Sequence, residues 1–161
     1  MEPSTQAHKD LYSTADRHTM RMAEESRIMG KNRVDELINF AQNSGIKRIG
    51  IAHCIGMQRE ANLLKERLGE KFEVHSVDCK YGHVPSSEML DNDTKGISCN
   101  PAGQADYLAK NNTELNISFG LCVGHDIVFN QKSTVPTTTL VVKDREHKHN
   151  PYKEFEVKTE E

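Results

Sequence analysis

The chain has 161 residues, a mass of 18.2 kDa, 35% hydrophobic residues and a formal net charge of -3 at pH 7. This size suits one domain with a single core. No stretch approaches the ~20 apolar residues of a membrane helix, and the polar N-terminus lacks the hydrophobic segment of a secretory signal. The 21 basic residues are dispersed and are outnumbered by 24 acidic ones, which excludes a purely electrostatic nucleic-acid binder. We therefore expect a cytoplasmic protein without nucleic-acid or membrane partners.

The hydrophobic pattern divides the chain into three parts. Residues 1–20 are rich in Ser, Thr, Asp and His and have little period, so they predict a flexible N-terminal arm. From about Met20 to Asn43 the spacing predicts one helix, with Val34, Leu37 and Ala41 on its apolar stripe. Residues 21–152 are expected to form a single α/β domain, and residues 153–161 a charged, frayed tail.

Short apolar runs alternate with helical patterns along the rest of the chain. Strands are predicted over 48–53, 72–77, 115–121 and 138–143, and helices over 57–69, 100–111 and 127–132. This alternation favours parallel strands joined by right-handed crossovers. We expect a three-layer α/β/α sandwich, Rossmann-like or flavodoxin-like, with about four parallel strands and an extra N-terminal helix. Residues 81–98 predict a long loop, of the kind that forms functional lids or is disordered.

The four cysteines all lie outside the predicted strands. Cys54, Cys79 and Cys122 directly follow the first three strands, and Cys99 precedes the Asn100-Pro101 helix start. Ligands of open α/β sheets bind at the carboxyl ends of the strands, so these thiols are expected to meet at one edge. Their gaps of 25, 20 and 23 residues do not resemble a zinc ribbon or a bacterial ferredoxin. Ordinary buried cysteines are the alternative to a shared metal site.

Polar residues beside the cysteines supply further candidates. His125 follows Cys122 and is a candidate catalytic acid, base or ligand, because an imidazole near thiolates can titrate near neutrality. Asp126 is a second catalytic candidate, with helix capping as its alternative role. Four residues are candidates for substrate binding or charge balance: Asn100, Gln104, Arg59 and Lys80. Asp144, Arg145, His149 and Asn150 follow the fourth strand and are weaker candidates for substrate contact.

Several motifs resemble those of a known family. Residues 49–56 (IGIAHCIG), 99–105 (CNPAGQA) and 120–126 (GLCVGHD) are similar to domain of unknown function 1847, a bacterial and archaeal family often labelled only as metal-binding proteins. The resemblance runs from about Met22 to Pro151 and implies a metal at the four cysteine positions. Two departures are the lack of cysteines near the N-terminus and the presence of His53 where a small residue is expected.

Three functional hypotheses remain open at this stage. The first is an iron–sulfur protein, with 4Fe-4S favoured, whose cluster is held by three or four of the cysteines and acts as a desulfidase or sulfurtransferase on a small thiolated or anionic molecule. The second is a zinc protein with a structural or hydrolytic site. The third is a non-catalytic thiol-based sensor or binding module. A homodimer is allowed for, since the sequence does not fix the quaternary state.

Overall fold

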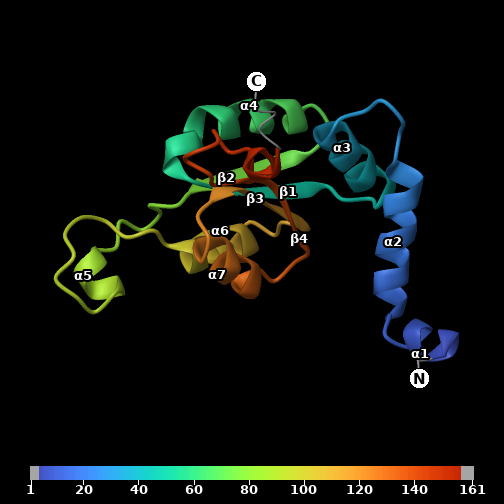
Figure 1. Ribbon diagram of the computed structural model, residues 1–161, viewed down its shortest axis with the longest axis horizontal. Helices are drawn as coiled ribbons and strands as arrows, with labels where there is room; N and C mark the ends of the chain where they lie inside the picture. The colour runs from blue at the N-terminus through green and yellow to red at the C-terminus, as the bar shows by residue number, and fades with distance from the viewer. Residues whose placement is uncertain (1–3, 157–161) are drawn as a thin grey trace. The chain divides into compact units, whose positions relative to one another are not determined.

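Four parallel strands form one sheet in the order β2-β1-β3-β4 (Figure 1). The computed structural model describes residues 4–156. In it β1 spans Arg48–His53, β2 Glu73–Asp78, β3 Leu115–Leu121 and β4 Thr137–Val142. Each strand lies within one residue of its predicted position. The central strands β1 and β3 are buried along almost their whole length, whereas the edge strands β2 and β4 are mostly half-buried. The prediction of a four-stranded parallel sheet is confirmed.

Helices cover both faces of the sheet. The 3-10 turn η1 (Ile55–Met57) leads into α4 (Gln58–Gly69), which packs on β1 and β2. On the opposite face lie α6 (Pro101–Lys110) and α7 (His125–Lys132), which pack against each other and against the sheet (Figure 1). The resulting α/β/α sandwich is the predicted Rossmann-like fold class.

The strand order places a topological switch point between β1 and β3. The chain moves from β1 to its neighbour β2 through α4, and then returns across β1 to β3 through α6. Right-handed crossovers in opposite directions put α4 and α6 on opposite faces. Open α/β sheets bind ligands in the crevice beyond the carboxyl ends of the strands at such a point. Cys54 follows β1 and Cys122 follows β3, so two of the four thiols flank this position.

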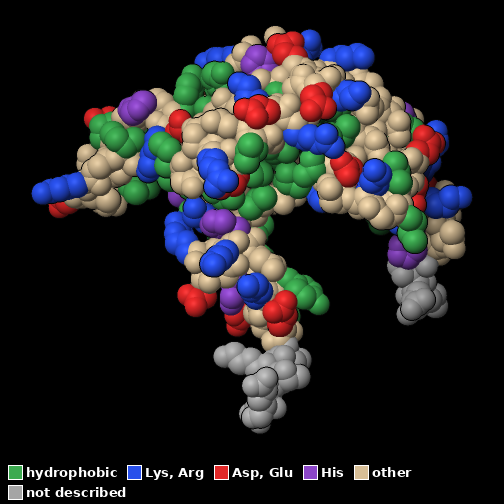
Figure 2. All heavy atoms as spheres, turned by 90° about the horizontal axis from the view of Figure 1, so that it is seen from above, with side chains coloured by type: hydrophobic (Ala, Val, Ile, Leu, Met, Phe, Trp, Pro, Cys, Tyr) green, Lys and Arg blue, Asp and Glu red, His purple; other side chains and the backbone are tan. Residues whose placement is uncertain are grey.

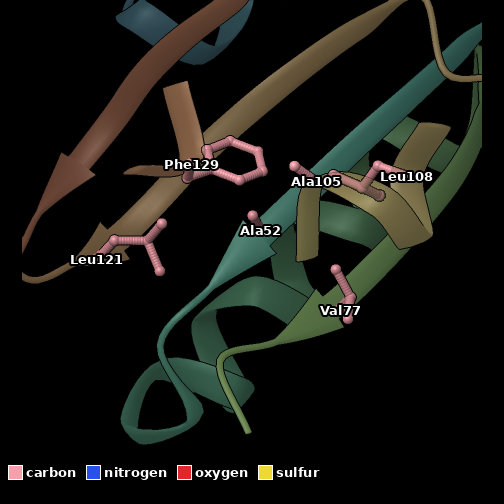
Figure 3. Close-up of a cluster of buried hydrophobic side chains, with 6 residues drawn as sticks. All are labelled: Ala52, Val77, Ala105, Leu108, Leu121 and Phe129. Carbon is pink, nitrogen blue, oxygen red and sulfur yellow. The ribbon is translucent and has the colours of Figure 1, made fainter. Parts of the chain in front are cut away.

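The core on the α6 and α7 side holds the sheet and helices together. Figure 3 shows Phe129 of α7 and Leu108 of α6 facing the side chains of β1, β2 and β3. Full burial of a side chain as large as Phe129 contributes about 1.5–3 kcal/mol. The cluster consists of Ala52, Val77, Ala105, Leu108, Leu121 and Phe129.

The long connection between β2 and α6 extends away from the sheet and carries one short helix, α5 (Ser86–Met89) (Figure 1). Its two arms are joined at the base, where Pro85 and Ile97 form an isolated antiparallel bridge and the Ser98 N–H donates to the Val84 carbonyl at 2.9 Å. The Asn100 N–H then donates to the Cys79 carbonyl at 2.7 Å. The predicted loop is therefore closed at its base, and this closure returns Cys99 to the side of Cys79.

Residues 4–46 and 47–156 form two units. The first contains α1 (Thr5–Lys9), α2 (Thr14–Ser26) and α3 (Arg33–Asn43). The prediction of one helix over residues 20–43 is wrong: Gly30 has a φ of +78°, and Asn32 caps the N-terminus of α3, so the chain breaks between two helices. Ser13 and Asp16 form a capping box that starts α2 within the segment expected to be a flexible arm.

The end of the described chain is also ordered into a turn. A 3-10 turn, η2, spans Pro151–Phe155, where a frayed tail was expected, and the rest of that predicted tail lies outside the described residues. Basic and acidic side chains are interspersed over the face shown in Figure 2. Within residues 4–156, no helix is long and apolar enough to cross a membrane.

Candidate functional site

The four cysteines are unpaired and lie where the sequence placed them, after β1, β2 and β3 and before α6. Cys54 is fixed by its backbone, because its N–H donates to the Phe119 carbonyl of β3 at 3.2 Å and its carbonyl accepts from the Met57 N–H. The Nζ atom of Lys143 lies 3.5 Å from the Cys54 Sγ atom. The first thiol at the switch point therefore has a cationic neighbour.

Cys79 is the buried member of the set, with 3% of its surface exposed. Its Sγ atom accepts a hydrogen bond from the Ile55 N–H at 3.4 Å. The pKa of Cys79 is raised to about 12, first by burial and then by the neighbouring thiols of Cys99 and Cys54, against the opposing effect of the Ile55 N–H. Three of the four thiols are therefore close enough to interact electrostatically.

Cys99 is half-buried and also has a cationic partner. The Nζ atom of Lys80 lies 3.6 Å from the Cys99 Sγ atom and donates to the Ile97 carbonyl at 2.7 Å. The carbonyl contact anchors the ammonium group beside the thiol. Lys80 was predicted to balance charge at the cysteine edge, and it contacts Cys99 rather than its sequence neighbour Cys79.

Cys122 is positioned by an irregular end of β3. The register between β3 and β4 shifts around Gly120, whose φ is +70°. A side chain at this position would collide with the sulfur of Met57, so only glycine allows the strand to bend here. The Nη2 atom of Arg145 lies 3.5 Å from the Cys122 Sγ atom. Each of the three half-buried thiols thus has its own Lys or Arg partner.

The segment after β4 supplies two of these cations. Lys143 and Arg145 flank Asp144, whose Oδ1 atom accepts from the His147 N–H at 2.9 Å and whose Oδ2 atom lies 3.1 Å from the His147 ring. The His147 N–H holds the pKa of Asp144 below its usual range, and the His147 ring and the Glu146 N–H act in the same direction. This tight turn fixes the backbone from which both cations extend.

Sequence reasoning named Arg145 only as a weak candidate and missed Lys143. Lys143 directly follows β4, so its position after a strand was a usable signal. The sequence could not show that its side chain passes the end of β3 to reach Cys54.

The structure gives Asn100 and Gln104 packing roles. The Asn100 side chain caps α6 by accepting from the Gly103 N–H at 2.9 Å, and it donates to the Tyr81 carbonyl at 3.0 Å. Gln104 is fully buried, and its Nε2 atom donates to the carbonyls of His53 and Val77 at 3.1 and 3.0 Å. It therefore ties the ends of β1 and β2 together. Substrate binding by either residue stays a prediction.

Arg59, His125 and Asp126 are less closely tied to the thiols. The Arg59 side chain is 85% exposed and lies 3.9 Å from the carboxylate of Glu60. His125 begins α7 at the same edge of the sheet and is half-buried. The Asp126 Oδ1 atom accepts from the Ile127 N–H at 2.7 Å, while Gly124 holds the N-cap position. A catalytic role for His125 or Asp126 stays a prediction.

The donor set at this edge consists of thiols, which suit zinc, Cu(I) or an iron–sulfur cluster. Cys54 and Cys99 lie close enough to Cys79 to affect its ionisation, and the sulfur chemistry of the three suits such a group. Within the described residues, however, no three His, Cys, Asp or Glu side chains are arranged as a metal-binding set.

Comparison with known proteins identifies the family. The sequence matches a family described as protein of unknown function (DUF1847) over residues 2–140. The chain belongs to the DUF1847 family. It is also 44% identical over 131 residues to an uncharacterised protein of Methanocaldococcus jannaschii, an alignment that covers 79% of this chain and 68% of the relative. The DUF1847 match includes all four cysteines but ends before Lys143 and Arg145.

Proposed function

We propose that this DUF1847 protein is a cysteine-ligated metalloprotein whose centre lies at the carboxyl edge of the sheet, with an iron–sulfur cluster as its metal group. The observation that carries the proposal is the proximity of Cys54, Cys79 and Cys99 at this edge. Closely spaced thiolates repel one another, and a bound metal group offsets that repulsion. Cys122, at the other side of the switch point, is the candidate fourth ligand.

The three cations support a cluster with net negative charge. Lys143, Lys80 and Arg145 each donate to a different cysteine sulfur at 3.5–3.6 Å. Hydrogen bonds to the sulfurs are one of the means by which proteins stabilise iron–sulfur clusters and set their potentials. A zinc ion bound by four thiolates also has a net negative charge and would be balanced by the same cations, so metal analysis has to separate the two groups.

The proposed reaction is removal of sulfur from, or transfer of sulfur to, a small thiolated or anionic molecule. If only Cys54, Cys79 and Cys99 held the cluster and Cys122 did not bind it, one iron would be open to take a sulfur atom as a soft ligand. The protein's part is to orient the substrate through Lys143 and Arg145 and to exchange a proton at the imidazole of His125. We place this activity in the cytoplasm, where thiols remain reduced.

Anaerobic purification of the full chain, followed by iron, sulfide and zinc analysis and a visible absorption spectrum, tests the proposal. Iron and sulfide in similar amounts, together with the visible absorption of an iron–sulfur cluster, are expected. Cys99→Ser should lose most of the iron, whereas Ser98→Ala, a change at the neighbouring residue, should keep it. Stoichiometric zinc in a colourless protein would overturn the cluster and favour the zinc alternative. Absence of any metal would overturn both.

A further inference from the structure

Helices α1 and α2 form without a core around most of their length. No residue of α1 is buried, and α2 buries only Met22 and Ser26, in the half that packs against α3 (Figure 1). Every residue from 4 to 21 is exposed, including Leu11 at 75% and Met20 at 52%. An isolated helix of about 12–15 residues is marginal in water, and packing against another element normally stabilises it. Within the described chain, this segment lacks that packing.

The sequence nevertheless fixes the shape of this segment. The Ser4 side chain caps α1 by accepting from the Ala7 N–H at 3.2 Å, and a capping box starts α2. The Nη2 atom of Arg17 donates to the Lys9 carbonyl at 2.6 Å, which holds the corner between the two helices. A surface that is ordered before it binds loses less conformational entropy on binding. The exposed segment is therefore suited to docking as it stands.

One face of α2 has a basic half and an acidic half. Arg17 and Arg21 lie one turn apart, and Glu24 and Glu25 lie in the next turn toward the C-terminus. Glu24 is paired with Arg27, whereas Glu25 has no ion pair with a described residue. Two such helices in antiparallel orientation place each basic half opposite an acidic half, whereas in parallel orientation like charges would meet. The face is thus complementary to itself about a two-fold axis.

A groove and an exposed apolar side chain flank this charged face. The groove, which we call the α2 groove, has a volume of about 710 Å³ and is lined by Thr14, Ala15, Arg17, His18 and Arg21. Just beyond the C-terminal end of α2, Ile28 is 49% exposed and Met29 is 99% exposed. When Arg21 faces Glu25 of a second, antiparallel copy, residues 28 and 29 of that copy come opposite residues 17 and 18. The alignment that pairs the charges therefore also brings Met29 to the α2 groove of the other copy.

We propose that two copies of this chain associate through antiparallel α2 helices. Arg21 of each copy pairs with Glu25 of the other, and Met29 of each copy enters the α2 groove of the other. Each contact occurs twice because the interface is isologous. The proposal uses only residues of the first unit and does not rest on a metal group at the thiols. Metal analysis tests the proposed function and the mass in solution tests the dimer, so the two can fail separately.

Sedimentation velocity of the full chain, purified with a reductant, tests the association. The mass should rise from 18.2 kDa to twice that value as the protein concentration rises from about 1 to 100 µM. Met29→Asp should raise the dissociation constant at least about tenfold, because it places a carboxylate in the interface. Leu63→Asp is the matched control, since Leu63 is 54% exposed on α4, and it should leave the constant unchanged. A chain that stays monomeric up to about 100 µM would overturn the proposal.

A charge exchange tests the antiparallel alignment. Arg21→Glu should weaken the association at least about tenfold, because like charges then meet across the two-fold axis. The double variant Arg21→Glu with Glu25→Arg should recover most of the loss, since each exchanged charge again faces its opposite in the second copy. A double variant as weak as the single one would rule out this pairing. Circular dichroism of each variant checks that its helices are formed.

Photo-crosslinking locates the contact directly in a chain with unaltered charges. With p-benzoylphenylalanine in place of Met29, irradiation should give a product of doubled mass on a denaturing gel. Peptide mass spectrometry should find the crosslink in residues 10–21, which include the α2 groove. A crosslink within one chain would show that the segment folds onto its own molecule. That result, or a two-chain crosslink to any other segment, would overturn the proposed interface even if a charge variant fails to fold.

Discussion

The Nζ atom of Lys143 donates to the Sγ atom of Cys54 at 3.5 Å, although 89 residues separate the two in the sequence. Lys143 follows β4 and Cys54 follows β1, and β3 lies between these two strands in the sheet. The contact therefore spans the end of β3 at the switch point. It joins the last strand to the thiol at the centre of the candidate site.

Lys143→Met should slow the alkylation of Cys54 by iodoacetamide about three- to tenfold at pH 7, because the ammonium group no longer stabilises negative charge on the attacking sulfur. Peptide mass spectrometry of the metal-free chain gives the rate at Cys54, with the rate at Cys99 as an internal reference. Lys143→Arg, which keeps the charge, should retain most of the rate. A rate at Cys54 that is unchanged in Lys143→Met would show that the contact has no effect on reactivity.

The raised pKa of Cys79 predicts a loss of stability at high pH. The folded chain holds this thiol protonated up to about pH 12, whereas in the unfolded chain it ionises near its ordinary pKa of 9.0. The stabilisation is therefore complete below about pH 8.5 and is lost as the pH rises toward 12, at up to about 1.4 kcal/mol per pH unit. Urea unfolding of the reduced, metal-free chain at pH 7, 9 and 10 measures it.

Cys79→Ala is the matched control for this pH dependence. Since alanine cannot ionise, the free energy of unfolding of this variant should fall less steeply between pH 9 and 10 than that of the unmodified chain. The difference between the two slopes isolates the thiol from the titration of lysine and tyrosine. Identical slopes would mean that Cys79 ionises as readily in the folded chain as in the unfolded one.

Gln104→Ala should destabilise the fold by about 2–4 kcal/mol, because it removes two hydrogen bonds and leaves the carbonyls of His53 and Val77 buried without that donor. Urea unfolding at pH 7 provides the free energy. Gln58→Ala, on the exposed side of α4, is the comparison and should change the free energy by less than about 0.5 kcal/mol. If the two substitutions lowered the free energy of unfolding equally, the hydrogen bonds from Gln104 to the His53 and Val77 carbonyls would not stabilise the fold.

Gly120→Ala should cost at least about 2 kcal/mol, because it combines a strained positive φ with a collision against Met57. The matched variant is Gly124→Ala at the same edge, where φ is +90° but no atom lies within 4 Å of the added Cβ. This control carries the backbone strain without the collision. If Gly120→Ala unfolds at the same temperature as Gly124→Ala or higher, the collision with Met57 does not explain why glycine is needed at the bend before Cys122.

Predictions from periodicity succeeded best for the sheet and its helices. The runs around Ile49, Ile51 and Ile117 are buried in the strands that were predicted, because a parallel strand covered on both faces buries apolar residues on each side. The helix expected over 20–43 was wrong because the apolar spacing continues through a break that Gly30 and Asn32 create. Hydrophobic periodicity indicates which residues face a core, but it does not indicate where the chain changes direction between two helices.

The sequence by itself determined the parallel α/β class and the position of Cys54, Cys79 and Cys122 at the ends of strands, because both follow from local apolar patterns and from the shared direction of parallel strands. Only the tertiary structure decided which thiol is buried and which cation meets which sulfur. Those contacts depend on strand order, on the closed base of the loop before Cys99 and on the bend at Gly120. All three bring together residues far apart in the chain, and no local pattern encodes such a distance.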